Sequence, residues 1–441
     1  MTYCGYDAIC LGGDVVKAED QSQELIRLLR EQSCWANVCT EPGMVAFMAS
    51  KAAALLREQP TSIEIHLSGG VLKNALSAGL PHTTERGPAV AAAAGAVARQ
   101  PEKGLTILGD LTPSQVDEAL GLVRTGRVTV KWDTCRLGVY GKCIVRSAGH
   151  VAEVVVSGSH TRVAEQRLDG RPVFASDDHP VTAGLSSLRS WTFDRLIDTV
   201  LSLETSELTW LLEGAKSCIG LSETNTLDPA RLSATPEDAC AALSCSGTPM
   251  TDAAGRTFKA IQARMSGTPW PVLTSGGSGN QGIMVSIPVW SISSEMGLCD
   301  EQKIRALALA HGVNMLVKAY TGEISSSCGG VSAGAGLAAA ICWMLGGSKP
   351  QISEAVTEVL ASLCGMVCDG AKATCALKGS SAVMTGIMAG AGASRSKQEL
   401  RDQGVVGRSI DETLARLETL NRRVLAQSDA VLLELAGIEK V

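Results

Sequence analysis

The chain has 441 residues, more than one hydrophobic core usually supports, so two or three domains are expected. Hydrophobic residues make up 45% and charged residues 19%, which is typical of globular proteins and argues against a disordered chain. The formal net charge is −6 and the sequence has no dense block of Lys and Arg, which argues against nucleic acid or an anionic membrane as the main partner.

The N-terminal segment has no basic stretch followed by an apolar run, so no signal peptide is predicted. The best candidate for a membrane span, residues 331–347, is slightly short and rich in Gly and Ala, and a buried helix is the better interpretation. Fifteen cysteines without a secretion signal favour free thiols in a reducing cytoplasm. Each cysteine is then either a small buried hydrophobic residue or a metal ligand.

Hydrophobic spacing predicts the secondary structure in chain order. Two helices are expected at 21–34 and 43–57, followed by a short strand, a glycine turn and a helix within 63–81. A stretch rich in β-branched residues then predicts strands, interrupted by a helix at 113–126. The remainder of the chain has a largely helical pattern to its end.

This order of elements predicts an α+β fold. A mainly helical domain is expected to comprise residues 1–87 and 206–441, with a smaller, β-rich α/β module inserted at 88–205. Aromatic residues are scarce at 3% and the chain has 46 glycines. Its helices are therefore expected to pack closely through small side chains.

The segment GSGNQG at 277–282 satisfies the G-x-G-x-x-G pattern of phosphate-binding loops. That function requires a strand before the pattern and a helix directly after it. The residues that follow include Pro288 and β-branched side chains, so no helix is predicted to start there. We interpret the segment as a glycine-rich loop with polar residues suited to a small substrate, namely Ser278, Asn280 and Gln281.

Three cysteines lie close together near the C-terminus: Cys364, Cys368 and Cys375. On one continuous helix their sulfurs would share a face, and burial in the core is the default interpretation. Asp369 and Gly370 interrupt the helical pattern, however, and Lys372 and Lys378 bring cations that stabilise thiolate. The segment has neither a C-x2-C pair nor ferredoxin spacing, so local spacing leaves the question of a metal open.

Two further cysteines complete the pattern. Cys328 lies on a loop of small residues before a glycine-rich helix, and Cys39 lies just before a predicted helix N-terminus, where the backbone dipole favours thiolate. With them, the chain resembles the L-cysteine desulfidase family, which is related to the alpha part of the iron–sulfur L-serine dehydratases. The resemblance rests on blocks in family order over most of the chain: CTEP (39–42), GGVLKNALSAGLP (69–81), GSHT (158–161), GSGNQGIMVSIPV (277–289), SSSCGGVSAGAG (325–336) and GMVCDGAKATCALK (365–378).

The resemblance implies a 4Fe–4S cluster whose ligands are Cys328, Cys368 and Cys375. It implies that Cys39 is a fourth ligand or a group close to the labile iron. Cys364 matches no cysteine of the family and is interpreted as structural. The family commonly has a second cysteine two places after the first ligand, where this chain has Gly330, and this departure puts the substrate preference in doubt.

The resemblance further implies a lyase, independent of pyridoxal phosphate, that converts L-cysteine to pyruvate, ammonia and sulfide in amino-acid catabolism. Candidates for the catalytic base are Cys39, Lys73 and Lys378. Candidate substrate contacts are Ser68, Asn74, His160, Asn280 and Gln281. A solvated helix face is the alternative role for Lys73, a structural role is the alternative for His160, and Glu41 is expected to cap its helix.

Other functions are compatible with the sequence. The same mechanism would serve L-serine or another β-substituted amino acid. A non-catalytic iron–sulfur redox sensor is one alternative, and it would need no open iron. A membrane transporter is another, and only the apolar segments 331–347 and 380–393 favour it. The predicted partner is a small amino acid, with no nucleic acid and no membrane, and a homodimer is compatible with the sequence.

Overall fold

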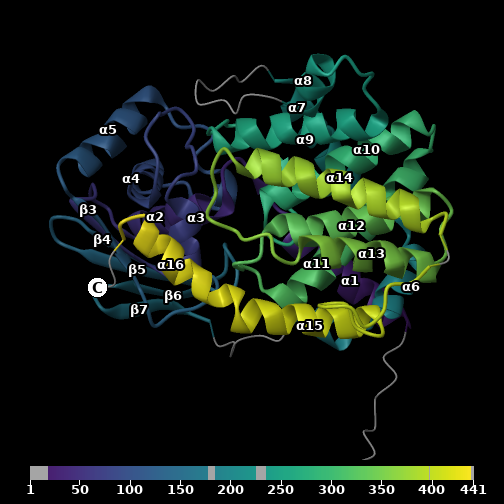
Figure 1. Ribbon diagram of the computed structural model, residues 1–441. Helices are drawn as coiled ribbons and strands as arrows, with labels where there is room; N and C mark the ends of the chain where they lie inside the picture. Colours follow the sequence, from purple (N-terminus) through teal and green to yellow (C-terminus); the bar gives the residue numbers. More distant parts are fainter. Residues whose placement is uncertain (1–17, 177–183, 225–234, 397, 439–441) are drawn as a thin grey trace, which may run out of the picture.

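The computed structural model shows two modules side by side (Figure 1). One is a sheet with helices, and we call it the sheet module (residues 38–176). The other is a bundle of helices, the helical module. The fold is α+β and mainly helical, which confirms the predicted class. The structure describes residues 18–176, 184–224, 235–396 and 398–438.

The sheet module is built on a mixed sheet with the strand order β3-β2-β4-β5-β6-β7. β2 and β3 pair in parallel, and the other neighbours in this sheet pair antiparallel. In β4 and β5 every second residue is buried, because side chains alternate between the faces and one face is covered. The strands are β2 (Ser62–Leu67), β3 (Val128–Trp132), β4 (Tyr140–Arg146), β5 (Val151–Ser157), β6 (Val163–Leu168) and β7 (Arg171–Ala175).

Helices share a hydrophobic core with the covered face of the sheet. Among them α2 is buried on nearly all sides. At Gly95 of α4 a Cβ would lie 2.1 Å from the carbonyl oxygen of Ala46 in α2, so these two helices pack backbone to backbone. The helices are α2 (Thr40–Leu55), α3 (Gly69–Ala75), α4 (Pro88–Ala98), the 3-10 helix η1 (Pro101–Thr106) and α5 (Pro113–Arg124).

The helical module packs its helices around α12. A Cβ at Gly336 of α12 would lie 2.2 Å from the carbonyl oxygen of Ala310 in α11, so the predicted close packing through small residues is confirmed here. The helices are α1 (Ala18–Gln32), α6 (Phe193–Ser202), α7 (Trp210–Glu223), α8 (Pro236–Ala242), α9 (Pro249–Met265), α10 (Gly279–Glu295), α11 (Asp300–Thr321), α12 (Gly329–Met344), α13 (Lys349–Leu363), α14 (Cys375–Ala393) and α15 (Ile410–Arg423), with the 3-10 helices η2 (Leu185–Ser190), η3 (Thr205–Leu208) and η4 (Leu425–Gln427).

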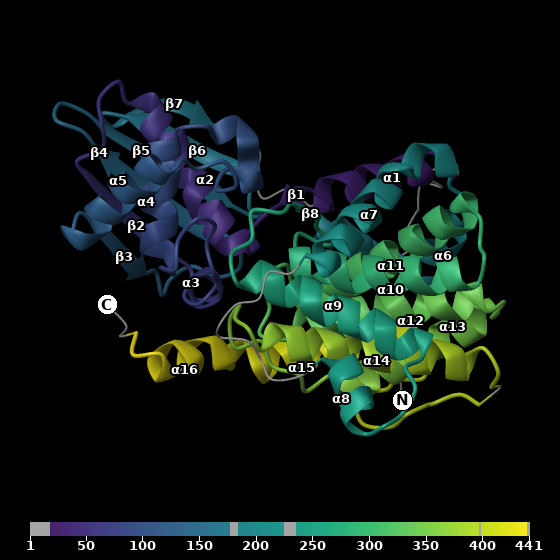
Figure 2. The ribbon, with the colours of Figure 1, turned by 90° about the horizontal axis from the view of Figure 1, so that it is seen from above.

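The last helix, α16 (Ser428–Leu435), reaches from the end of α15 to the sheet module (Figure 2). Its Leu433 belongs to the hydrophobic core of the sheet module. The C-terminal end of the described chain therefore connects the two modules again, in addition to the connection between α1 and α2.

The residues of the two hydrophobic cores do not separate at positions 88 and 205, the expected boundaries of the inserted module. α2 and β2 precede residue 88 yet belong to the core of the sheet module, and β2 lies between β3 and β4. α6 precedes residue 205 yet packs in the helical core. The difference arises because strand pairing is a long-range contact that the local pattern of a strand does not reveal.

Within the described ranges, no helix has both the length and the apolar character that crossing a bilayer requires. The segment 331–347 lies mostly in α12, whose side chains pack in the helical core. The N-terminal segment on which the signal-peptide prediction rests lies outside the described residues.

Candidate active site

A cavity lies between the two modules, and residues of both line it. It measures about 100 Å³, well below the roughly 300–1,000 Å³ of pockets for drug-sized ligands, so it suits a small molecule. The sheet module contributes the N-terminal end of α2, part of α3 and the loop after β5. Residues singled out in the sequence that line the cavity include Cys39, Glu41, Asn74, His160, Ser278, Asn280, Gln281, Cys328, Cys368, Cys375 and Lys378.

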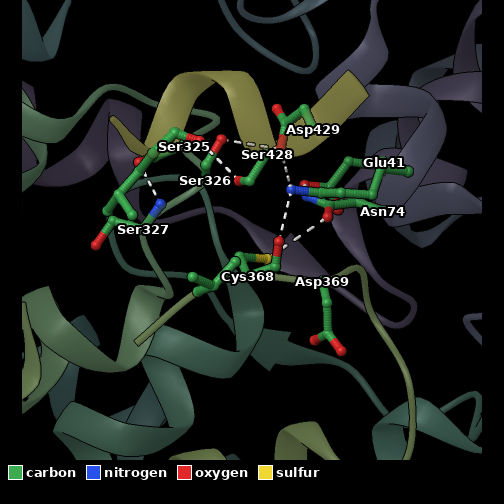
Figure 3. Close-up of polar contacts among 12 residues, drawn as sticks. Glu41, Asn74, Ser325, Ser326, Ser327, Cys368, Asp369, Ser428 and Asp429 are labelled. Atoms are coloured by element: carbon green, nitrogen blue, oxygen red, sulfur yellow. Dashed lines mark hydrogen bonds and ion pairs between the residues drawn. The ribbon is translucent and has the colours of Figure 1, made fainter. Parts of the chain in front are cut away.

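Two backbone hydrogen bonds hold the cysteine-bearing loops side by side. The amide of Cys328 donates to the carbonyl of Met366 at 2.8 Å, and the amide of Cys368 donates to the carbonyl of Ser326 at 2.7 Å. The pairing is that of a short antiparallel bridge. Figure 3 shows Ser325, Ser326 and Ser327, the residues just before Cys328, on the side that faces Cys368. Cysteines far apart in the sequence therefore share one site.

The loop that carries Cys368 interrupts the helical pattern, as predicted from Asp369 and Gly370. α13 ends before the loop, and α14 begins after it with Cys375. Gly370 has a φ of +96°, which side chains other than hydrogen rarely allow. Cys364 is the C-cap residue directly after α13, and its thiol donates to a carbonyl in the last turn of that helix at 3.5 Å. The three C-terminal cysteines therefore do not share a helical face.

The three cavity thiols near α12 and α14 influence one another. Cys328 is the N-cap residue of α12, and Cys375 is the first residue of α14. Burial raises the pKa of Cys328 to about 12, with a further contribution from Cys368. Burial, with a smaller contribution from Cys368, also raises the pKa of Cys375. The sulfurs are therefore close enough that negative charge on one disfavours negative charge on the next.

Lys378 places a cation beside these thiols. Its Nζ donates to the carbonyl of Val367 at 2.8 Å and to Oδ1 of Asp369 at 2.6 Å. Burial by itself would lower the pKa of Lys378, but Asp369, with the nearby thiols, raises it above its usual value. The amine is therefore protonated at neutral pH, and it favours the thiolate form of its neighbours.

Glu41, in the first turn of α2, is a buried carboxylate that joins three cavity residues. The thiol of Cys39 donates to Oε2 at 2.9 Å, and Nδ2 of Asn74 donates to Oε1 at 2.9 Å. Nε2 of His160 lies 3.8 Å from Oε1, an ion-pair distance beyond hydrogen-bond reach. Glu41 was expected to cap its helix, whereas its carboxylate bonds to side chains of the cavity.

The charge of Glu41 is stable in this environment. Burial by itself would raise the pKa of Glu41, but the contacts with His160, Cys39 and Asn74 outweigh it and hold the pKa well below its usual value. Burial, and then the negative charge of Glu41, raise the pKa of Cys39 well above its usual value. Cys39 is therefore a neutral thiol beside an ionised carboxylate. Its position before a helix N-terminus suggested a thiolate, but burial and the charge of Glu41 outweigh the helix dipole.

Two residues predicted for the site lie outside the lining of the cavity. Lys73 is buried, and its Nζ donates to the carbonyl of Cys368 at 2.9 Å and to Oδ1 of Asp429 at 2.6 Å. Ser68 is fully buried, and its hydroxyl donates to the carbonyl of Gly138 at 2.6 Å. Both side chains are committed to other groups, so neither is placed to touch a ligand.

The glycine-rich segment 277–282 leads into a helix, contrary to expectation. α10 begins at Gly279 and continues through Pro288, because burial of most of this helix outweighs the loss of one backbone donor. The strand before it, β8 (Val272–Leu273), pairs antiparallel with β1 (Trp35–Ala36). The parallel β-α-β surroundings of a dinucleotide site are therefore absent around this segment, all of which is described.

Packing accounts for these glycines. A Cβ at Gly279 would lie 2.5 Å from the guanidinium of Arg264, and one at Gly282 would lie 1.9 Å from a carbonyl oxygen of β8. Buried Arg264 also donates to Oδ1 of Asn280 at 3.0 Å. The close approach holds Asn280 and Gln281 in the cavity wall.

Sequence reasoning missed two charged residues of the cavity, Lys318 and Glu323. Burial lowers the pKa of Lys318, whose Nζ donates to the carbonyl of Gly276. Burial raises the pKa of Glu323, and Lys318 and His160 partly offset this. Across the described chain, Glu323 has no hydrogen-bond or ion-pair partner. Their only signal in the sequence is their position shortly before the SSSCGG block.

The cavity contains donor atoms of the type that iron–sulfur clusters use. Among the residues that the structure describes, no three His, Cys, Asp or Glu side chains are arranged to hold a single metal ion. Three thiols, one before α12, one between α13 and α14 and one at the start of α14, nevertheless line one cavity beside a cation, and cysteine thiolates are the usual ligands of such clusters. At Gly330 a Cβ would lie 3.0 Å from the methyl group of Ala382, so α14 packs closely where the desulfidase family commonly has a second cysteine.

A thiol-lined cavity with charged side chains from two modules is a candidate binding site for a small molecule. The chain belongs to the serine dehydratase alpha chain family, whose model matches residues 195–434, more than half of the chain. The matched part runs from α6 to α16 and includes the three cysteines of the cavity near α12 and α14. The predicted relation to the alpha part of the serine dehydratases is therefore confirmed.

Relatives extend the likeness over both modules. A UPF0597 protein of Moorella thermoacetica is 38% identical over 416 residues, which cover 92% of this chain and 96% of the relative. UPF0597 proteins of Methanocella arvoryzae and Aeromonas hydrophila are each 31% identical, and the matches cover 93% and 94% of this chain and 97% and 96% of the relatives. These names state neither a substrate nor a cofactor.

Proposed function

We propose that this chain is an iron–sulfur-dependent lyase that performs α,β-elimination on a small amino acid, with L-cysteine as the preferred substrate and pyruvate, ammonia and sulfide as products. The gathering of Cys328, Cys368 and Cys375 around one small cavity supports the proposal best. Family membership supports the lyase class, and the resemblance to the desulfidases supports the choice of substrate. L-Serine or another β-substituted amino acid is the alternative.

In this proposal the three cysteines hold a 4Fe–4S cluster. When bound, the cluster supplies a Lewis-acidic iron that favours departure of the β-substituent. Lys378 stays protonated beside the thiols and favours their anionic form. The packing of α12 against α14 fixes the distance between the loops that carry them.

The base that takes the Cα proton must lie in the cavity and be unprotonated. Lys73 is committed to two partners, Lys378 is protonated, and burial disfavours the thiolate of Cys39. Lys318 also lines the cavity, but its Nζ donates to the carbonyl of Gly276. We therefore assign the proton to the imidazole of His160, which lines the cavity. Glu41 then stabilises the imidazolium, because its ionised carboxylate lies 3.8 Å from Nε2.

The substrate is a zwitterion, so its site needs charges of both signs. Lys378 lines the cavity, unlike Lys73, and its protonated Nζ has a third hydrogen beyond its bonds to Val367 and Asp369, so it suits the carboxylate. The unpartnered carboxylate of Glu323 suits the α-ammonium group. Asn280 and Gln281 supply neutral donors and acceptors in the wall between them. These residues orient an amino acid without a covalent intermediate on the protein.

Anaerobic preparation followed by substrate assays tests the proposal. We expect about four irons per chain, and release of sulfide and pyruvate from L-cysteine in equal amounts. Ammonia and pyruvate from L-serine at a higher kcat/KM would move the assignment to a dehydratase. A protein that binds the iron but turns over no β-substituted amino acid would contradict the lyase assignment and favour a redox sensor.

Replacing Glu323 by glutamine is expected to raise KM for the amino acid roughly 10- to 100-fold with little change in kcat, because a charged hydrogen bond to the ammonium group is lost. Steady-state kinetics measure the change. Glu358→Gln is the matched control: burial raises the pKa of Glu358 too, but it lies on α13 outside the cavity lining. An unchanged KM in the Glu323 variant would refute the assignment.

A further inference from the structure

The C-terminal helices cross from one module to the other directly over the cysteine loops. Figures 1 and 2 both show α15 along the helical module and α16 reaching the sheet module, where it lies against α3. Leu433 anchors α16 in the core of the sheet module. On α15, Asn421 accepts from the hydroxyl of Ser325 at 3.0 Å and donates to the carbonyl of Thr321. The segment between α11 and α12 is therefore held from the C-terminal helices.

Asp429, in the first turn of α16, connects three segments through one carboxylate oxygen. Its Oδ1 accepts from Nζ of Lys73 at 2.6 Å and from the hydroxyl of Ser326 at 2.9 Å. The same Nζ of Lys73 donates to the carbonyl of Cys368 at 2.9 Å. Figure 3 shows Asp429 above Ser326 and Cys368, with these contacts converging between the helix and the loop.

Because Lys73 is buried, its position depends on the partners of its ammonium group. The side chain of Lys73 is only 3% exposed, so its ammonium group depends on the partners it has inside the protein. Asp429 supplies the countercharge, and the carbonyl of Cys368 supplies a second acceptor. Ser326, in turn, accepts the amide hydrogen of Cys368 at 2.7 Å. Both peptide groups of Cys368 are thus tied, directly or through one residue, to the carboxylate of Asp429.

We propose that Asp429 is a positioning residue that fixes the backbone of Cys368, acting through Lys73 and Ser326. Lys73 then has a structural role in place of the predicted role as a base. Its ammonium group joins Asp429 of α16 to the backbone of Cys368. The inference rests on the proposed function in one respect, that Cys368 is a cluster ligand. The hydrogen bonds from which it is inferred are present in the protein without any metal.

The test uses the full chain free of metal, kept reduced under anaerobic conditions. The rate of alkylation by a maleimide is measured for each cysteine by mass spectrometry, in wild type and in Asp429→Asn. Cys143 and Cys342 serve as internal references, because each is fully buried and they lie in the cores of the sheet and helical modules respectively. Their rates report general unfolding, and the rate of Cys368 reports the loop.

We expect Asp429→Asn to raise the alkylation rate of Cys368 at least tenfold and to leave Cys143 and Cys342 unchanged. Ser326→Ala, which removes a single donor, is expected to raise it severalfold. Asp402→Asn is the matched control, since Asp402 is exposed, lies before α15 and pairs with Arg408 and Arg416. Its rate at Cys368 is expected to equal that of wild type.

An unchanged rate at Cys368 in Asp429→Asn would overturn the inference. A rise of equal size at Cys143 and Cys342 would overturn it as well, because Asp429 would then only stabilise the whole fold. The measurement involves neither iron nor substrate, so the absence of lyase activity would count against the proposed function and leave this result standing. Reconstituted Asp429→Asn is further expected to hold less iron than wild type.

Discussion

Replacing Cys368 by alanine is expected to abolish both iron binding and turnover. The residue lies in the cavity, on the loop bridged to the Cys328 loop, and its sulfur is close enough to raise the pKa of Cys328 and Cys375. Losing one of three thiolate ligands leaves a cluster without its full attachment. Iron content, the visible absorption of the anaerobic protein and pyruvate formation are the three measurements, and all are expected to fall to background.

Cys364→Ala is the matched control for this prediction. Cys364 lies four positions earlier in the same stretch, but it is the C-cap residue of α13 and is not part of the cavity lining. The control variant is expected to keep its iron and its turnover. If iron and turnover persist in the Cys368 variant, or disappear equally in both variants, the ligand assignment is wrong.

Glu41→Gln is expected to lower kcat roughly 100- to 1,000-fold, within the range usual for a lost contribution to acid–base catalysis. The ionised carboxylate joins Cys39, Asn74 and His160, and the amide that replaces it carries no charge to stabilise an imidazolium. Iron content is expected to stay at the level of wild type, because the proposed ligands Cys328, Cys368 and Cys375 are untouched.

Glu64→Gln provides a close comparison. Glu64 also lies beside a histidine, with Oε1 2.8 Å from Nε2 of His66, but on β2 and outside the cavity lining. The same chemical change there is expected to leave kcat unchanged. If turnover of Glu41→Gln equals that of wild type, His160 does not depend on Glu41 and the proton transfer must be assigned elsewhere.

The mainly helical α+β class could be predicted from local pattern, because hydrophobic periodicity records which face of an element is buried. The break at Asp369 and Gly370 was predicted for the same reason, since glycine and its neighbours report backbone conformation locally. Pro288 shows where this reasoning ends: its missing N–H predicts no helix, yet burial of α10 on most sides maintains one. The module boundaries also differed, because β2 takes its partners from distant parts of the chain.

The cysteines and most of the polar residues that line the cavity were named from the sequence, through the resemblance of its blocks to a known family. What the sequence alone did not determine is which side chains are free to react. Lys73 has the chemistry of a base, but buried contacts with Cys368 and Asp429 commit its amine. Glu323 has no motif of its own, and only the tertiary structure leaves its carboxylate unpartnered in the cavity. Whether a side chain is free to react depends on its burial and on partners from distant parts of the chain, and both arise only when the chain folds.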